Sequence, residues 1–233
     1  MMNQISLIHQ DPTIFISSQW QSNKNRPTIK YLLYRTIIML IFIITWIKAI
    51  LTDGPIWFKY FTNWGYTICT IQAILVFLMI SAKKCSCENV LEKLYPLYWM
   101  LNIVGTSLAF FITAIYFSVL HDYQQTISLL NYLVHGNNSL LMFIDLLIVA
   151  HPMHIPHGVY PVTFGLVYII FSIIYFLIYP TNGTIYQILD WSKPLVTIGI
   201  CLSLIGVLNF FHLIAALMSQ LRQDIHKKYF NNN

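Results

Sequence analysis

Long apolar runs, separated by short polar segments, constrain this chain more than any other feature of its sequence. Apolar and aromatic residues make up 57% of the 233 residues and charged residues only 9%, against roughly 25% charged in a soluble domain. A helix needs about 20 mostly apolar residues to cross roughly 30 Å of hydrocarbon. The runs do not show the two-residue alternation of outer-membrane strands. The sequence therefore predicts an all-α membrane bundle and excludes a soluble globular protein.

Six windows between charges or prolines have the length of a membrane span. They are Tyr31–Thr52, Asn63–Ala82, Pro96–Leu120, Leu129–Ala150, Gly158–Tyr179 and Lys193–Ser219. Together they predict a transmembrane domain over residues 31–219, with a polar N-terminal tail over residues 1–30 and a C-terminal tail over residues 220–233. The tail before the first span has no long apolar run, so we expect the first span to act as the insertion signal.

The distribution of Lys and Arg predicts how these spans are oriented. If the N-terminus is cytoplasmic, most of the cations lie on the cytoplasmic side, and only Lys48, Lys59 and Lys193 lie towards the other face. The positive-inside rule then places both termini in the cytoplasm. The net charge of +5 is too sparse for a nucleic-acid partner. We expect membrane lipids as partners, with other membrane proteins as further candidates.

The fourth window carries a stripe of polar side chains. Asn131, His135, Asn138, Met142 and Asp145 follow one another at steps of four, three, four and three residues, which places them on one helix face. Polar groups at membrane depth turn away from lipid. The stripe therefore predicts either interhelical hydrogen bonds or a ligand or catalytic pocket.

A rise of 1.5 Å per residue places three ionisable groups at one depth near the cytoplasmic end. Arg35, Asp145 and His212 lie roughly 6 to 10 Å inside their spans by this count. We expect Asp145 to pair with Arg35 or His212, with Asn209 one turn from His212 as a further hydrogen-bonding group. In the alternative, Arg35 extends to the headgroups and Asp145 pairs with His212 alone.

Two hydroxyl groups are candidates for a nucleophile that His135 would activate. Thr45 in the first span lies at the depth of His135, and Ser139 follows His135 by one helical turn. A hydroxyl beside an imidazole can form a nucleophile and base pair, but threonines, serines and histidines also hydrogen-bond helices without any chemistry. No catalytic residue is therefore assigned, and these three remain alternatives.

The histidine-rich loop and the cysteines give further candidate sites. His151, His154 and His157 lie in a loop that contains two prolines, so we predict an interfacial turn and no metal or other cofactor. Cys85 and Cys87 follow two lysines at a cytoplasmic membrane edge, a context that suits palmitoylation. Asn182 begins an Asn-Gly-Thr glycosylation sequon on the expected outer side.

Four segments together resemble the rolling stone family of multi-pass membrane proteins, within a wider group that includes the androgen-induced and androgen-dependent membrane hydrolases. The likeness covers most of residues 31–220. It rests on Tyr60-Phe61-Thr62-Asn63-Trp64-Gly65, on His135-Gly136-Asn137-Asn138-Ser139 with Asp145, on Tyr160-Pro161 with Gly165-Leu166-Val167-Tyr168, and on Ile188-Leu189-Asp190-Trp191-Ser192-Lys193-Pro194. The resemblance implies about six helices and a cell-surface role in fusion of muscle precursor cells.

The hydrolase relatives imply a second possible function. In them, an intramembrane threonine and the second histidine of an H-G-x-H segment cleave esters of fatty acids with hydroxy fatty acids. Those positions fall on Leu33 and Asn138 here, and neither side chain can perform the same step.

We therefore expect a non-catalytic protein of the plasma membrane that acts in membrane contact or cell fusion. A lipid-ester hydrolase is the alternative, and a transporter or channel is a third possibility, although the chain shows no inverted halves. An internal membrane is the alternative location.

Overall fold

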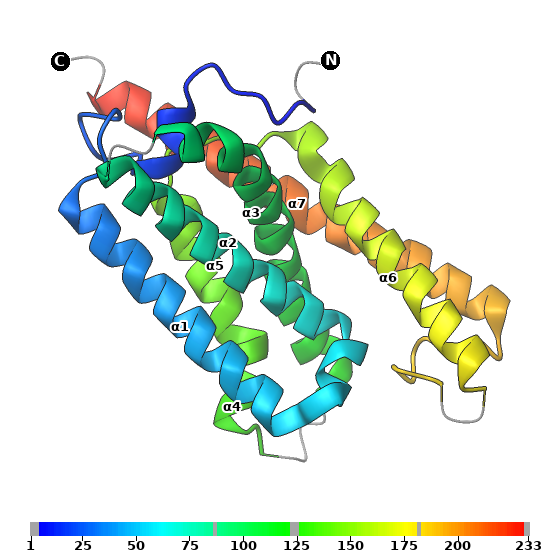
Figure 1. The fold of residues 1–233 in the computed structure, drawn as a ribbon. Coiled ribbons are helices and arrows are strands. Elements are labelled where there is room, and N and C mark those ends of the chain that lie inside the picture. The colour runs from blue at the N-terminus through cyan, green and yellow to red at the C-terminus, as the bar shows by residue number, and fades with distance from the viewer. Residues whose placement is uncertain (1–4, 86–87, 122–125, 181–182, 231–233) are drawn as a thin grey trace.

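The computed structural model describes residues 5–85, 88–121, 126–180 and 183–230, and it confirms the predicted all-α membrane class (Figure 1). The helices are α1 (Ile29–Asp53), α2 (Phe61–Lys84), α3 (Glu88–Ile115), α4 (Leu129–Tyr132), α5 (Asn138–Ile148), α6 (Val159–Ile178) and α7 (Pro194–Phe230). Within the described ranges, the one strand-like feature is an isolated bridge between Ser18 and Val149.

Five helices are long and apolar enough to cross a membrane, and they correspond to five of the six predicted spans. They are Ile29–Lys59, Phe61–Lys84, Asn89–Leu120, Ile155–Ile178 and Pro194–Tyr229. The fourth predicted span is divided into α4, the π-helix η5 (Leu133–Asn137) and α5. None of the three pieces alone is long enough to span a membrane. Together they run from the lower end of the molecule to its upper end, alongside the long helices (Figure 1). Whether the fourth predicted span crosses the membrane, which would make six crossings, is therefore still a prediction. The cytoplasmic location of both termini is also still a prediction.

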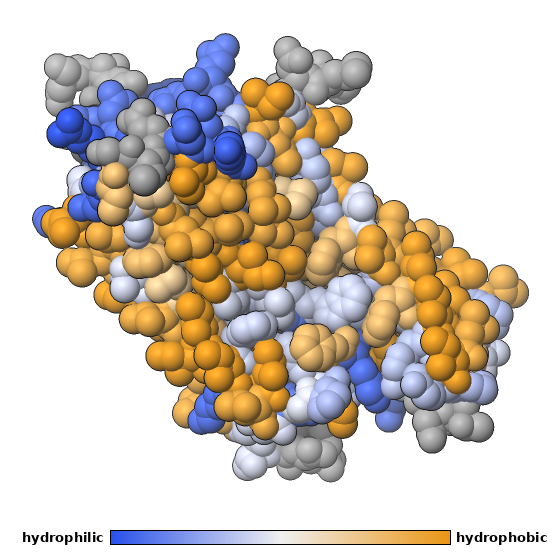
Figure 2. Space-filling view, in the orientation of Figure 1, coloured by the Kyte–Doolittle hydropathy of each residue, from blue (hydrophilic) through white to orange (hydrophobic). Residues whose placement is uncertain are grey.

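An apolar belt covers the sides of the molecule, and polar residues gather at its upper end (Figure 2). On α1, Leu33, Ile37, Leu40 and Ile44 are exposed at steps of four, three and four residues, so one face of this helix points outward. Large apolar side chains on so much of the surface require lipid around the protein. The first described residues and the end of α7 lie at the same end of the molecule (Figure 1), the end where polar residues gather (Figure 2).

Helix α3 lies at the centre of the bundle. It contacts α2, α5, α6 and α7, and residues 101–109 are all buried, the pattern of a helix surrounded by protein. Two glycines let α2 and α3 approach closely. A Cβ at Gly65 would lie 2.5 Å from the side chain of Ile112, and one at Gly105 would lie 3.2 Å from the sulfur of Cys69.

Helices α6 and α7 pack against each other and lean away from the other helices at the lower end of the molecule (Figure 1). An apolar cavity of about 80 Å³ lies in this angle. Its walls come from α2, α3, α6 and α7, with Phe61, Phe111, Tyr168 and Leu204 among the lining residues. His135 does not line it, so this cavity does not supply an ester-binding site beside that histidine.

Described residues near both ends of the chain pack against the rest of the molecule. Phe15 and Ile16, in the 3-10 helix η2 (Pro12–Ile16), are fully buried. The backbone N–H of Gln19 donates to the backbone carbonyl of Ile148 at 2.8 Å. The overall polarity of residues 1–30 concealed this short apolar patch. Helix α7 continues past the predicted boundary at residue 219, and Arg222 beyond it is buried.

Candidate functional site

The structure brings together Arg35 from α1 and Asp145 from α5. One guanidinium nitrogen of Arg35 lies 2.6 Å from Oδ1 of Asp145, and both side chains are at most 1% exposed. Thus Arg35 does not extend to the headgroups, and that alternative is wrong. Removing two charges from water is costly unless further hydrogen bonds surround them.

Tyrosines surround the guanidinium of Arg35. Its Nε and Nη2 donate to the hydroxyl of Tyr31 at 3.0 and 2.8 Å, and Nη2 also donates to the hydroxyl of Tyr98 at 3.1 Å. Tyr31 lies one turn before Arg35 on α1, and Tyr98 belongs to α3. Helix α3 is therefore bound to the cation directly.

The carboxylate of Asp145 has its own hydrogen-bond donors. The hydroxyl of Tyr34 donates to Oδ1 at 2.9 Å, and the amide of Asn102 donates to Oδ2 at 3.1 Å. The same amide lies 3.4 Å from the carbonyl oxygen of Gln72 on α2. Four helices, α1, α2, α3 and α5, thus meet around one ion pair, which we call the Arg35–Asp145 network.

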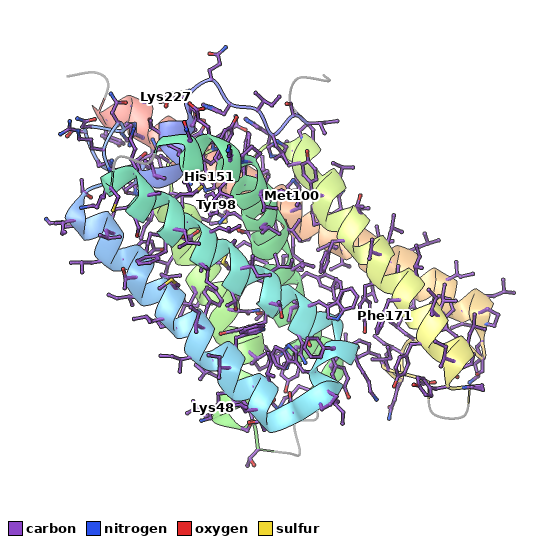
Figure 3. All side chains as sticks on the ribbon, in the orientation of Figure 1. Lys48, Tyr98, Met100, His151, Phe171 and Lys227 are labelled. Atoms are coloured by element: carbon purple, nitrogen blue, oxygen red, sulfur yellow. The ribbon has the colours of Figure 1, made fainter. Side chains whose placement is uncertain are left out.

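The network continues to the polar end of the molecule through His151. Nε2 of His151 lies 3.0 Å from the hydroxyl of Tyr98, while its backbone carbonyl accepts from Nη2 of Arg222 at 2.7 Å. Burial lowers the pKa of His151 well below its usual range, and the charges of Arg222 and Arg35 lower it further. The ring is therefore neutral, and it connects α3 to α7 without adding charge. Figure 3 shows Tyr98 and His151 beside each other.

His212 does not join this network, although counting residues predicted the same depth for it as for Asp145. Its Nδ1 lies 3.1 Å from the hydroxyl of Ser107, and its Nε2 lies 3.1 Å from the backbone carbonyl oxygen of His154. Ser107 and Asn102 are five residues apart on α3, so they point about 140° apart around its axis. Asn209, one turn from His212, is exposed. Counting residues predicts depth in the bilayer but not the direction around a helix.

A second polar cluster lies towards the other end of the fourth predicted span. The ring of His135 stacks on that of Tyr116, with centroids 3.9 Å apart and an angle of 9°. Tyr116 begins the π-helix η4 (Tyr116–Leu120) and His135 lies in η5. Asn138 is fully buried, whereas Asn131, at the start of the polar stripe, is exposed. π-Helical turns occur frequently at functional sites.

Two polar nitrogens in this cluster are buried and have no partner in the described part of the chain. They are Nδ1 of His135 and Nδ2 of Asn138. The hydroxyl of Thr113 approaches the carbonyl of His135 at 2.5 Å and Oδ1 of Asn138 at 3.3 Å. Most buried polar atoms in native proteins are hydrogen-bonded, so this pair of nitrogens is a candidate for contact with a small polar group.

Nδ1 of His135 has no hydrogen bond to either hydroxyl predicted as an alternative nucleophile. The hydroxyl of Ser139 donates to the carbonyl of Gly136 at 2.8 Å, and Thr45 is buried on α1. Leu33, at the position of the threonine in the hydrolase relatives, is 57% exposed on the outer face of α1.

The remaining candidate sites lie apart from these clusters. His157 packs edge-on against Trp99 with ring centroids 4.9 Å apart, and His154 lies 5.1 Å from the ring of His157. The part of the chain that the structure describes contains no group of three side chains arranged to hold a metal ion. Cys85 is exposed at the end of α2. Cys87 and Asn182 lie outside the described residues.

Several residues of the Arg35–Asp145 network were absent from the sequence prediction. Gln72 and Asn102 are amides inside long apolar runs, and the search for polar residues within spans that selected Asn138 would also have found them. The tyrosines gave no comparable signal, because aromatic residues are common at membrane edges. Arg222 was assigned to a tail from its position near the C-terminus.

The fold and this network define a multi-pass α-helical membrane protein whose helices are held by a buried ion pair. The family model described as "Rost: Protein rolling stone" matches residues 3–231, so the chain belongs to the rolling stone family. It is also 32% identical over 208 residues to "Protein rolling stone" of Drosophila melanogaster, an alignment that covers 78% of this chain and 73% of that relative. No solved structure matches the chain.

Proposed function

We propose that this protein acts without catalysis in membrane contact or cell fusion at the plasma membrane, the role that its resemblance to rolling stone implies. The observation that carries the proposal is the Arg35–Asp145 network, in which the buried charges hold helices together. Of the two hydroxyls considered as nucleophiles, that of Ser139 donates to the backbone carbonyl of Gly136. These groups support a structural use of the polar residues within the membrane.

The segments at the lower end of the molecule limit how such a protein could contact a partner. Their described residues are 54–60, 121, 126–128, 179–180 and 183–193, and stretches of this length are too short for a separate folded domain. The first of them exposes Ile56 and Phe58 next to Leu51 at the end of α1. Exposed apolar side chains at a helix end fit contact with lipid or with another membrane protein.

A cell-mixing assay tests the proposal. Fusion-competent cells that lack this protein are given the wild-type chain or a variant, labelled with two cytoplasmic dyes, and scored for mixing of their contents. We expect wild-type and His135→Ala chains at equal surface level to restore fusion equally. The exposed residues Ile56 and Phe58 are both replaced by Ser in a third chain, which should restore less. Failure of the wild-type chain to raise fusion, or loss of fusion in His135→Ala alone, would refute a non-catalytic fusion role.

A lipid-ester hydrolase remains the second candidate because His135 and Asn138 hold buried nitrogens without partners beside two π-helices. Purified protein would be incubated with a fatty acid ester of a hydroxy fatty acid and with a fluorophosphonate probe. Turnover and labelling that vanish in His135→Ala, but persist in the control Ser118→Ala, would favour the enzyme. No turnover and no labelling would favour the structural role.

A further inference from the structure

A second cavity, of about 430 Å³, lies at the polar end of the molecule between the N-terminal segment, the loop after α5 and the end of α7. Its polar lining includes Lys24, Lys227, His9, His154 and Gln19. The volume falls in the range of roughly 300 to 1,000 Å³ that is typical of ligand sites. It lies apart from both polar clusters in the membrane.

The charged side chains that line this cavity, Lys24 and Lys227, are both positive. None of its lining residues is acidic. Of the nearby acidic residues, Asp11 accepts hydrogen bonds from the backbone and hydroxyl of Thr13, and Asp224 is exposed on α7 and does not line the cavity. Buried or partly buried cations without a counter-charge are costly, so the cavity favours an anion.

Lys24 is held at this cavity and is repelled by a second cation, Arg222. The ammonium of Lys24 donates to the carbonyls of Ser18 and Gln19 at 2.6 and 2.5 Å, which holds it at the cavity. Burial, together with repulsion from Arg222, lowers the pKa of Lys24 to about 8. Arg222 is 2% exposed, and its Nε is buried without a partner in the described part of the chain.

The cavity begins at the headgroup layer of a membrane and extends outward from it. Arg222 and Lys227 follow the last long apolar stretch of α7, which ends near Leu217, by about 8 and 15 Å along the helix. The headgroup region extends roughly 5 to 8 Å beyond the hydrocarbon on each side. Figure 2 shows hydrophilic residues above the apolar belt at this end, and Figure 3 places Lys227 at the same end. A ligand in the cavity could therefore remain anchored in the bilayer.

We infer that this cavity binds the phosphate-bearing headgroup of an anionic membrane lipid, held by Lys24 and Lys227 with the imidazoles and amides of the lining. With the predicted orientation, the cavity faces the cytoplasmic leaflet, where anionic lipids concentrate. The inference does not depend on the proposed role in fusion, because it concerns a different part of the molecule.

Binding of short-chain lipids to the purified full-length protein tests this inference. Dioctanoyl phosphatidylinositol 4,5-bisphosphate, phosphatidylserine and phosphatidylcholine are titrated by native mass spectrometry in a neutral detergent. We expect the first two to bind and phosphatidylcholine to bind at least tenfold more weakly. In Lys24→Gln/Lys227→Gln, the affinity for both anionic lipids should fall by about fivefold per lysine removed. The charge-matched control is Lys84→Gln/Lys228→Gln, whose lysines do not line the cavity, and its affinity should stay within twofold of wild type.

Two further arms keep the inference falsifiable. Lys227→Gln alone changes an exposed side chain, so it should fold normally and still lose about fivefold in affinity. Free inositol phosphates are titrated alone to separate a soluble anion from a lipid. Equal losses in the control and cavity variants, unchanged affinity in Lys227→Gln, or equal binding of the free headgroup and the whole lipid would each overturn the inference.

Discussion

Replacing Asp145 by Asn keeps the shape of the side chain but removes the charge that faces Arg35. The guanidinium then remains buried without its anion, and breaking a buried pair in this way costs about 3–5 kcal/mol. The new amide group also loses one of the two acceptor oxygens that Tyr34 and Asn102 use, which adds about 1–3 kcal/mol if a buried donor is left unpaired. Since whole domains are stable by only about 5–15 kcal/mol, we expect a large loss of folded protein.

A double-mutant cycle measures this coupling. The free energy of unfolding is determined in detergent micelles by titration with dodecyl sulfate for Asp145→Asn, Arg35→Met and the double variant. We expect the double variant to be about as stable as Asp145→Asn alone, because no unpaired charge remains. Independent sites add within about 0.5 kcal/mol, so full additivity of the two losses would refute the pairing. Asp190→Asn is the control, because its contact with Lys193 is 4.0 Å long and exposed, and it should cause no measurable loss.

Three further changes test other parts of the structure. Arg222→Met removes charged hydrogen bonds to two buried carbonyls and should lower the free energy of unfolding by about 3 kcal/mol in the same titration. A Cβ at Gly183 would lie 2.4 Å from the backbone oxygen of Tyr179, the residue after α6, whereas one at Gly199 meets nothing within 4 Å. Gly183→Ala should therefore lower the melting temperature, and Gly199→Ala should raise it or leave it unchanged. Because the folded-state pKa of Lys24 is lowered to about 8, the unfolded chain binds more protons between about pH 8 and 10.4. The free energy of unfolding of the wild type, minus that of Lys24→Gln, should therefore rise with pH across that window. A difference that does not change with pH would contradict the burial of the Lys24 ammonium.

The sequence was sufficient for those features that depend on local properties of the chain. The length of an apolar run decides whether a helix can cross the hydrocarbon, so the all-α membrane class and the approximate spans followed directly. The rise of 1.5 Å per residue placed Arg35 and Asp145 at one depth, and the cost of charge in lipid indicated that they turn inward. The same reasoning could have included Gln72 and Asn102, which interrupt apolar runs in the same way.

Tertiary packing decided the partners of these groups and the surroundings of each helix. Counting residues predicted the depth of Asp145 for His212, but His212 approaches Ser107 on a different side of α3, because rotation about a helix axis depends on how all its neighbours pack. The central place of α3 and the burial of Phe15 and Arg222 against distant segments depend on contacts between residues far apart in the chain. Local composition and periodicity carry no record of such contacts, so only the assembled helices reveal them.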